Sequence, residues 1–232
     1  MKAFLILSLA SLMSCAGHRP GHGQMGHHAP GEMNKEFLSP TLDVEKWKQN
    51  FSGQERDVAK YQNEILQGLK LKAGERVADV GAGTGLFIPG LSKAVGPKGK
   101  VFAVEISPRF VEELKNLSKE KKLQNVEVVL GKMESTELKA ASVNSVLVVD
   151  TYHHFDHPEK MLKDFHQALS SQGKLAIVDF NKTPEARPWI QHHIRLNKAE
   201  YIREIESNGF KFSHEVSIPM KENFMLIFQK TN

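Results

Sequence analysis

The chain has 232 residues, 40% of them apolar and 25% charged, enough for one folded domain once an N-terminal segment is set aside. Its formal net charge is +4 and its pI is about 9.0, but lysine and arginine are dispersed among acids, which argues against a nucleic-acid-binding protein. The single cysteine excludes an intramolecular disulfide. The composition does not predict an oligomeric state.

The first residues have the pattern of a secretory leader. An apolar run extends from Ala3 to Met13, which is too short to span a bilayer as a stable helix but has the length of a signal-peptide core. The run ends in Leu12-Met13-Ser14-Cys15, which resembles the bacterial lipobox. The resemblance implies cleavage before Cys15, acylation of that residue and a membrane anchor. An ordinary secretory signal or a buried thiol is the alternative.

We therefore expect residues 1–14 to be a lipoprotein signal peptide and the mature protein to lie on the periplasmic side of a membrane. Ala16 follows the cysteine, where an Asp would resemble an inner-membrane retention signal, so the outer membrane is favoured.

Residues 15–34 and 35–54 form two short segments before the domain. The first is rich in Gly, His and Pro and is expected to be a flexible tether. Its four histidines, His18, His22, His27 and His28, suggest a transition-metal site, but flexible imidazoles are not a preorganised site, so a solvated linker is favoured. In the second segment, Trp47 and scattered aromatic residues predict a lead-in helix that packs on the domain.

Residues 55–232 alternate between β-rich runs and helical patterns, which is typical of a parallel α/β sheet. Apolar residues at helical spacing predict a helix from Glu55 to Lys70. Further helices are predicted from Ser107-Pro108 to about Lys121, after a capping box at Asp156 to Glu159, and after a second capping box at Asn197 to Glu200. The predicted strands are Arg76–Val80, Lys100–Glu105, Val126–Leu130, Ser145–Asp150 and Lys174–Phe180, followed by a hairpin of Phe212–Ile218 and Glu222–Gln229.

A glycine-rich turn follows the first of these strands. It reads Asp79-Val80-Gly81-Ala82-Gly83-Thr84-Gly85 and precedes a predicted helix, a context in which the backbone turns sharply and approaches a ligand closely. A dinucleotide fingerprint requires glycine at its first, third and sixth positions, and the sixth position here, counted from Gly81, is Leu86. The spacing therefore favours a different nucleotide-binding motif.

This motif resembles motif I of the class I S-adenosylmethionine-dependent methyltransferases, and the resemblance extends over about residues 55–230. It implies a Rossmann-like α/β fold with a mostly parallel seven-stranded sheet and a C-terminal antiparallel hairpin. It also implies S-adenosylmethionine as cofactor, a small-molecule methyl acceptor and no metal. The general resemblance is to methyltransferases of the quinone-biosynthesis type.

The resemblance assigns residues to the cofactor. The glycine loop, including Gly81, Ala82, Gly83, Thr84 and Gly85, would pack on the methionine and ribose portions, and Asp79 would help to hold the ammonium group. Glu105 ends the second strand and offers paired acceptors to the ribose hydroxyls. Ile106 and Met133 would line the adenine, whereas Lys132 departs from the acid or amide that the family commonly has there.

The resemblance places the fourth strand's end, Asp150-Thr151-Tyr152-His153-His154, beside the sulfonium and the acceptor. If the acceptor is a hydroxyl or thiol, a general base helps, and His153, His154 or Asp150 are candidates. Structural loop histidines are the alternative. Trp189 with His192 and His193 suggests a lid, although packing of a surface helix is favoured.

Two function classes besides an enzyme stay open. Lys132, together with the cytoplasmic origin of the cofactor, is compatible with a non-catalytic cofactor-binding module of the same fold. The histidines of the tether are compatible with a His-rich metal-binding lipoprotein. The methyl acceptor itself is not predicted, because acceptor pockets are formed by variable segments such as Thr183 to Asn197.

Overall fold

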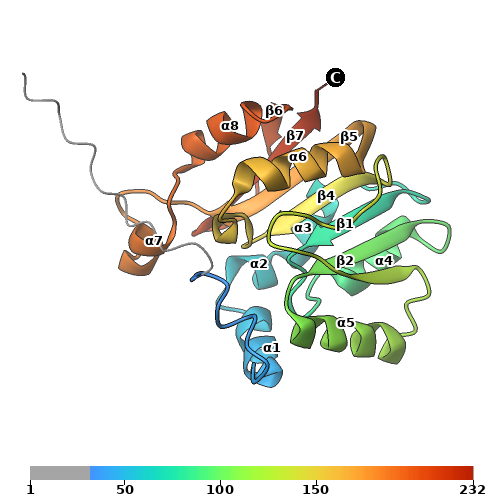
Figure 1. Cartoon of the computed structure of the whole chain (residues 1–232). Helices are drawn as coiled ribbons and strands as arrows, with labels where there is room; N and C mark the ends of the chain where they lie inside the picture. The colour runs from blue at the N-terminus through green and yellow to red at the C-terminus, as the bar shows by residue number, and fades with distance from the viewer. Residues whose placement is uncertain (1–31, 232) are drawn as a thin grey trace, which may run out of the picture.

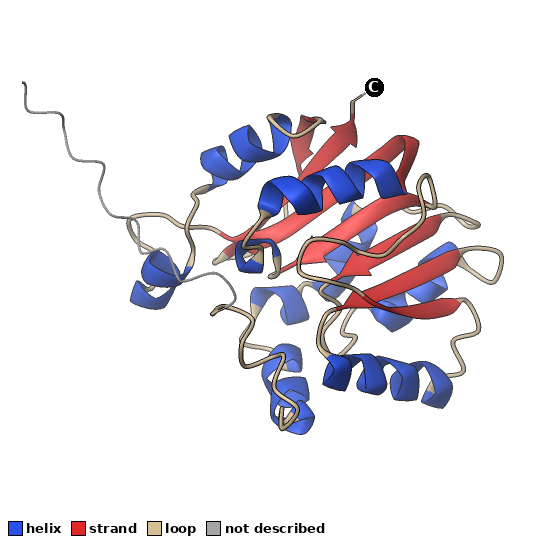
Figure 2. Cartoon of the chain, viewed as in Figure 1, coloured by secondary structure: helices blue, strands red, loops and turns tan. Residues whose placement is uncertain are grey.

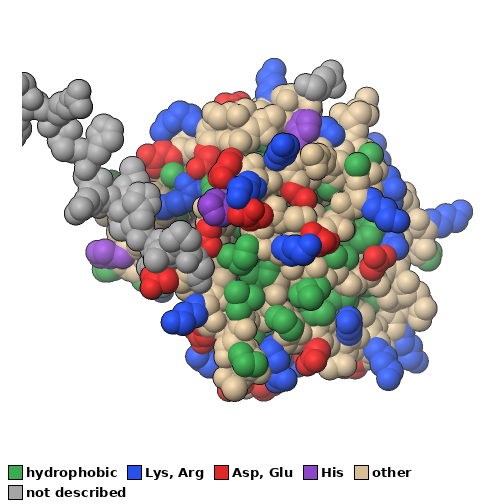
Figure 3. Space-filling model, viewed as in Figure 1, with side chains coloured by type: hydrophobic (Ala, Val, Ile, Leu, Met, Phe, Trp, Pro, Cys, Tyr) green, Lys and Arg blue, Asp and Glu red, His purple; other side chains and the backbone are tan. Residues whose placement is uncertain are grey.

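A computed structural model describes residues 32–231 of the chain (Figure 1). The expected signal peptide, Cys15 and all but the end of the expected tether lie outside these residues. Within residues 32–231, no helix has the length and apolar character needed to cross a bilayer. Basic and acidic side chains are interspersed over the face in Figure 3, as the dispersed charges of the sequence predict.

In the described part of the chain, seven strands form one sheet in the order β3-β2-β1-β4-β5-β7-β6 (Figure 2). The first five strands run parallel, and β7 is antiparallel to both β5 and β6. The predicted class, a mostly parallel seven-stranded sheet with an antiparallel C-terminal pair, is confirmed. The strands are β1 (Arg76–Val80), β2 (Lys100–Glu105), β3 (Val126–Leu130), β4 (Val143–Val149), β5 (Leu169–Phe180), β6 (Phe210–Glu215) and β7 (Asn223–Lys230).

Helices cover both faces of the sheet, because side chains alternate between the faces along each strand. Val146 and Val148 of β4 face the layer that contains α6 and α8, whereas Leu147 faces the layer of α2 to α5. The helices are α1 (Val44–Ser52), α2 (Asp57–Lys60), α3 (Gln62–Gly68), α4 (Ile88–Val95), α5 (Pro108–Glu120), the 3₁₀ helix η1 (Tyr152–His154), α6 (Pro158–Ala168), α7 (Pro188–His193) and α8 (Lys198–Glu206).

Several predicted elements match the structure closely. The first three predicted strands have the observed bounds. The capping box before α8 is present, since the Asn197 side chain accepts from the Glu200 amide and the Glu200 side chain accepts from the Asn197 amide. Helix α1 confirms the predicted lead-in helix and contacts α5.

Other predictions were wrong in detail. The single helix predicted from Glu55 to Lys70 is divided at Tyr61, whose ψ of 26° interrupts the regular turn between α2 and α3. The capping box predicted at Asp156 is absent: Pro158 occupies the first turn of α6, so His157 is the N-cap, and its side chain makes no capping bond. Strand β5 begins at Leu169, five residues earlier than predicted, because α6 ends at Ala168.

The strand order reverses beside β1, which pairs with β2 on one side and β4 on the other. In open parallel sheets, the carboxyl ends of the strands at such a point flank a crevice where ligands bind. Here these ends are the glycine loop after Val80, Glu105 on β2 and Asp150 after β4. The fold therefore brings the three predicted site regions to one edge of the sheet.

Candidate active site

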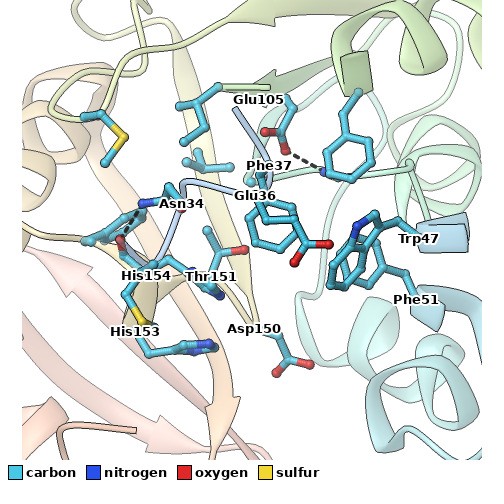
Figure 4. Close-up of a pocket in the computed structure, with 18 of the residues that line it drawn as sticks. Asn34, Glu36, Phe37, Trp47, Phe51, Glu105, Asp150, Thr151, His153 and His154 are labelled. Carbon is cyan, nitrogen blue, oxygen red and sulfur yellow. Dashed lines mark hydrogen bonds between the residues drawn. The ribbon is translucent and has the colours of Figure 1, made fainter. Parts of the chain in front are cut away.

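A cavity of about 480 Å³ opens at this edge, a size typical of small-molecule sites. Figure 4 shows part of its lining. The lining residues come from the N-terminal segment, α1, the loops after β1, β2, β3 and β4, and α7. The predicted site residues on this cavity are Gly81, Gly83, Glu105, Ile106, Met133, Asp150, His153 and His154. A smaller neighbouring cavity of about 70 Å³ is lined by Asp79, Ala82 and Thr84 and shares Gly81, Gly83 and Asp150.

The glycine loop crosses from β1 toward β2 and β4. The amides of Gly81 and Ala82 both donate to the Val104 carbonyl, at 2.9 and 3.1 Å. Gly81 has a φ of 75°, and a Cβ atom there would lie 2.3 Å from Cγ2 of Thr151. Only glycine is compatible with this conformation and this close approach. Gly85 lines neither cavity, because it is turned toward Leu114 and Leu117 of α5.

Glu105 is buried, and its carboxylate organises the loops around it. Its Oε2 accepts from the Gly83 amide at 2.8 Å (Figure 4). Its Oε1 accepts from the Ser107 amide at 2.8 Å. Burial raises the pKa of this carboxyl, and the amides of Ser107, Gly83 and Ile106 oppose that rise. A carboxylate offers about four acceptor positions, so these amides leave acceptor capacity for a ligand hydroxyl.

Asp79 lines the smaller cavity and is almost completely buried. Desolvation, together with the nearby Glu105 charge, raises the pKa of Asp79 to about 7. A positively charged ligand group in the small cavity would favour the ionised form of this carboxyl. The position is compatible with the ammonium-binding role implied by the sequence motif.

Asp150 is buried, with a φ of 45°, and both of its carboxylate oxygens are engaged. The Arg56 guanidinium donates to Oδ2 at 2.6 Å, and the Asn223 amide donates to Oδ1 at 2.7 Å. Burial raises the pKa of Asp150 to about 6, and Arg56 opposes that rise. These contacts favour a positioning role for Asp150 over that of a general base. The sequence did not indicate Arg56 or Asn223, which lie far from it along the chain.

His153 is paired with a buried acid that the sequence analysis missed. Its Nδ1 lies 2.7 Å from Oδ1 of Asp179, a fully buried residue near the end of β5. The Asp179 carboxylate also accepts from the amides of His153 and Phe180. This acceptor favours the tautomer of His153 with the proton on Nδ1, which leaves Nε2 as a base or a ligand. A signal was present, because Asp179 follows an apolar run at the carboxyl end of a predicted parallel strand.

The neighbouring side chains hold η1 in place. The hydroxyl of fully buried Tyr152 donates to Oε1 of Glu204 at 2.7 Å, and Arg195 donates to both Glu204 oxygens. The rings of His153 and His154 lie 4.4 Å apart. His154 therefore presents its ring beside His153 at the same cavity.

Helix α7 lies beside η1, and two of its aromatic residues line the cavity. The Trp189 ring stacks on His193 with centroids 4.7 Å apart, and His193 lies 5.2 Å from the His153 ring. Both residues line the cavity, whereas His192 does not. The positions of Trp189 and His193 thus fit the lid alternative, whereas that of His192 fits packing of a surface helix.

The N-terminal segment covers another part of the cavity. The side-chain amide of Asn34 donates to the His154 carbonyl at 3.0 Å, and the Phe37 ring lies edge-on to the His154 ring at 5.7 Å (Figure 4). Phe37 also contacts an aromatic group formed by Trp47, Phe51 and Phe110. The expected lead-in segment, together with Asn34 at the end of the expected tether, therefore contributes side chains to the site itself.

These observations fit S-adenosylmethionine. Glu105 has acceptors for ribose hydroxyls, the glycine loop has no side chain where the ligand approaches, and Asp79 adjoins a compartment suited to an ammonium group. Ile106, Phe110 and Met133 supply an apolar surface for a base. Lys132, which the sequence marks as a departure from the family pattern, is largely exposed and forms an ion pair with Glu137 at 3.0 Å.

Comparisons with known proteins agree with this geometry. Residues 71–232 match a family described as Methyltransferase domain. The chain is 26% identical to an uncharacterized methyltransferase, YcgJ, of Bacillus subtilis over 146 residues, which cover 60% of this chain and 55% of the relative. It is 26% identical over 116 residues to the ubiquinone/menaquinone biosynthesis C-methyltransferase UbiE of Pasteurella multocida, covering 48% of this chain and 42% of that protein.

A solved structure extends the match. The crystal structure of a SAM-dependent methyltransferase from Aquifex aeolicus has a TM-score of 0.67 and 25% identity, covering 88% of this chain and all of that one. The chain spans about half the length of the curated relatives just named. The extent of the family match, together with the shared fold, shows that this chain belongs to the class I S-adenosylmethionine-dependent methyltransferases, with S-adenosylmethionine as cofactor.

Proposed function

We propose that this chain transfers the methyl group of S-adenosylmethionine to a hydroxyl or thiol of a small molecule held in the large cavity. The single observation that supports this acceptor class best is the His153–Asp179 pair, because a histidine oriented by a buried carboxylate is suited to accept a proton. When bound, the cofactor would supply a methyl group on a positively charged sulfur, which would keep the electron pair of the carbon–sulfur bond as the acceptor bonds to the methyl carbon.

The residues of the chain align the reactants and remove water. Glu105 and the glycine loop hold the cofactor at the ends of β1 and β2. Phe37, Trp47 and Trp189 line the cavity with aromatic surface that excludes water from the reacting groups. Nε2 of His153 takes the acceptor proton, and Asp179 stabilises the resulting imidazolium.

The test is calorimetry of the full-length protein in detergent with S-adenosylmethionine and with its demethylated product, followed by a methyl-transfer screen over phenols, alcohols and thiols. Binding of both compounds and transfer to a hydroxyl or thiol are expected. Transfer to carbon alone would contradict the acceptor class and favour a quinone-biosynthesis type, to which the similarity with UbiE also points. Binding of both compounds without transfer to any acceptor would favour the non-catalytic module.

Replacement of Glu105 with alanine is expected to raise the dissociation constant for S-adenosylmethionine by about tenfold or more, because charge-assisted hydrogen bonds contribute roughly 1.5–3 kcal/mol. The substitution also leaves the buried Gly83 and Ser107 amides without their acceptor, so the unfolding midpoint should fall. Calorimetry and thermal unfolding measure the two effects. Glu127→Ala, an exposed acid on β3, is the control, and equal affinity in a folded Glu105→Ala protein would disprove the assignment.

We also propose that the protein is a lipoprotein anchored through Cys15 on the periplasmic side, with the outer membrane favoured. The apolar run before Leu12-Met13-Ser14-Cys15 supports this. Cys15→Ser is expected to move the protein from the membrane to the soluble fraction, whereas Ser14→Ala, which keeps a small residue before the cysteine, should not. An unchanged membrane fraction with an intact N-terminus by mass spectrometry would contradict the proposal.

The second candidate function is a cofactor-binding or metal-binding lipoprotein without methyl transfer. The observation that favours it is the location implied by the leader, because S-adenosylmethionine is made in the cytoplasm and a lipoprotein faces away from it. The histidines of the tether supply the ligands for the metal-binding alternative. Metal titration shows whether the tether or the domain binds the metal. It compares the full-length protein with a variant in which Asn replaces His18, His22, His27 and His28.

A further inference from the structure

Three imidazoles converge on the wall of the large cavity. His153 and His154 come from η1 and His193 comes from the last turn of α7, forty residues away in the chain. One ring nitrogen of each lies within 4.8 Å of the corresponding nitrogens of the other two. All three residues line the cavity, and His153 is buried while the other two are partly exposed. The fold, not a sequence motif, brings them together.

The surroundings of His153 are those of a metal-binding histidine. Metal-ligating histidines commonly donate their second ring N–H to a carboxylate, which fixes the tautomer and the orientation of the ring. Asp179 accepts at 2.7 Å from Nδ1 of His153, so the lone pair of Nε2 is the one available to an ion. The same carboxylate is fixed by the amides of His153 and Phe180, which prevents it from turning away.

We propose that His153, His154 and His193 form a binding site for a divalent transition-metal ion of the zinc type, whose remaining coordination position takes the hydroxyl or thiol of the methyl acceptor. Three neutral imidazoles suit Zn²⁺ and similar ions, and three protein ligands with one open position are typical of catalytic zinc sites. The inference that an ion binds rests only on the arrangement of these three histidines. The role given to the acceptor rests on the proposed function.

The distances require a small closure around the ion. Zinc binds imidazole nitrogens at about 2.0–2.1 Å, so a tetrahedral site holds them roughly 3.3 Å apart, about 1.5 Å closer than the widest separation here. Helix α7 supplies only His193, and it carries Trp189 stacked against that ring. A hydroxyl or thiol that enters the open position from the cavity would be acidified by the ion and would lose its proton to water, so the ion would activate the acceptor in place of His153. Nε2 of His153 has one lone pair, so it can bind either the ion or a proton, but not both at once.

The test uses the full-length chain with His18, His22, His27 and His28 replaced by Asn, which removes competition from the tether. Titration with Zn²⁺ by calorimetry is expected to give one site per chain. His193→Ala and His154→Ala should each weaken that site by about a hundredfold or more, since loss of a mere outer-sphere partner already costs about 10–100-fold. Asp179→Asn should weaken it by about tenfold or more. His192→Ala, the neighbouring histidine that does not line the cavity, is the matched control and should bind as the parent does.

A spectroscopic measurement identifies the ligands. Co²⁺ in place of Zn²⁺ should give the intense visible absorption of a four-coordinate ion in the parent, and this absorption should be lost in His193→Ala. Adding a thiol such as 2-mercaptoethanol should shift the bands if the open position faces the cavity. Far-ultraviolet circular dichroism of each variant verifies that it is folded.

Other outcomes would overturn the inference. The site is disproved if the parent has no Zn²⁺ affinity in the micromolar range, or if His193→Ala and His154→Ala both bind Zn²⁺ as His192→Ala does. Calorimetry with S-adenosylmethionine in metal-free buffer tests the proposed function separately. Cofactor binding without Zn²⁺ binding would contradict only the metal site. Zn²⁺ binding without cofactor binding would contradict only the proposed function.

Discussion

Replacement of His153 with alanine is expected to lower the rate of methyl transfer at saturating cofactor by about a hundredfold or more, while the affinity for S-adenosylmethionine stays nearly unchanged. The residue presents Nε2 to the cavity because Asp179 holds Nδ1. The cofactor contacts assigned to Glu105 and the glycine loop do not involve this side chain. Single-turnover transfer, followed across pH in the wild type and the variant, measures the effect.

Further variants separate the possible roles of His153. His192→Ala is the control for loss of a histidine near the site and should leave the rate unchanged. His193→Ala should also preserve the rate if His153 acts as a base alone, but should lower it if the three histidines hold an ion. Loss of cofactor affinity in His153→Ala without a turnover defect would indicate a structural role. An unchanged rate and pH profile in both His153→Ala and His154→Ala would remove the catalytic role from both residues.

Replacement of Gly81 with alanine is expected to lower the free energy of unfolding by about 3 kcal/mol and to weaken cofactor binding by more than tenfold. A non-glycine residue at its φ of 75° costs about 1–2 kcal/mol, and overpacking adds about 1–3 kcal/mol. The new Cβ would lie 2.3 Å from Cγ2 of Thr151, so the loop after β4 must shift at the point where both cavities meet. Chemical denaturation and calorimetry give the two quantities.

The chain offers a matched control for this effect. Gly74 has a φ of 88°, but a Cβ there would have no neighbour within 4 Å, so Gly74→Ala isolates the backbone strain and should cost only about 1–2 kcal/mol. Thr151→Ala in the Gly81→Ala background removes the two closest colliding atoms and should restore part of the stability. Equal losses in Gly81→Ala and Gly74→Ala would show that the contact with Thr151 has no energetic consequence.

Much of the fold could be predicted because it is encoded in local signals. Apolar runs predicted three strands with their observed bounds, Arg76–Val80, Lys100–Glu105 and Val126–Leu130. The capping box at Asn197 predicted the start of α8. The glycine loop and Glu105 were found because the motif needs them at a set spacing along the chain. Gly81, Gly83 and Glu105 do line the large cavity, whereas Gly85 lines neither cavity.

The rest of the site depends on contacts between distant segments. Arg56, Asp150 and Asn223 form one hydrogen-bonded group although 167 residues separate the first from the last. The pairing of His153 with Asp179 likewise follows from the adjacency of β4 and β5. No periodic pattern encodes such pairs. The division of the helix predicted from Glu55 to Lys70 is also not encoded in a local pattern. The helical spacing of apolar residues continues through Tyr61, but the backbone leaves the helical conformation there.

The two tryptophans of the chain, Trp47 on α1 and Trp189 on α7, both line the large cavity. When emission is excited at the red edge of the near-ultraviolet band, where tyrosine does not absorb, all of the intrinsic fluorescence therefore originates from the walls of the site. Trp47→Phe and Trp189→Phe would each leave a single emitter, one reporting from the N-terminal side and the other from α7. The protein thus contains its own label-free probe of cofactor arrival and of movement on either side of the cavity.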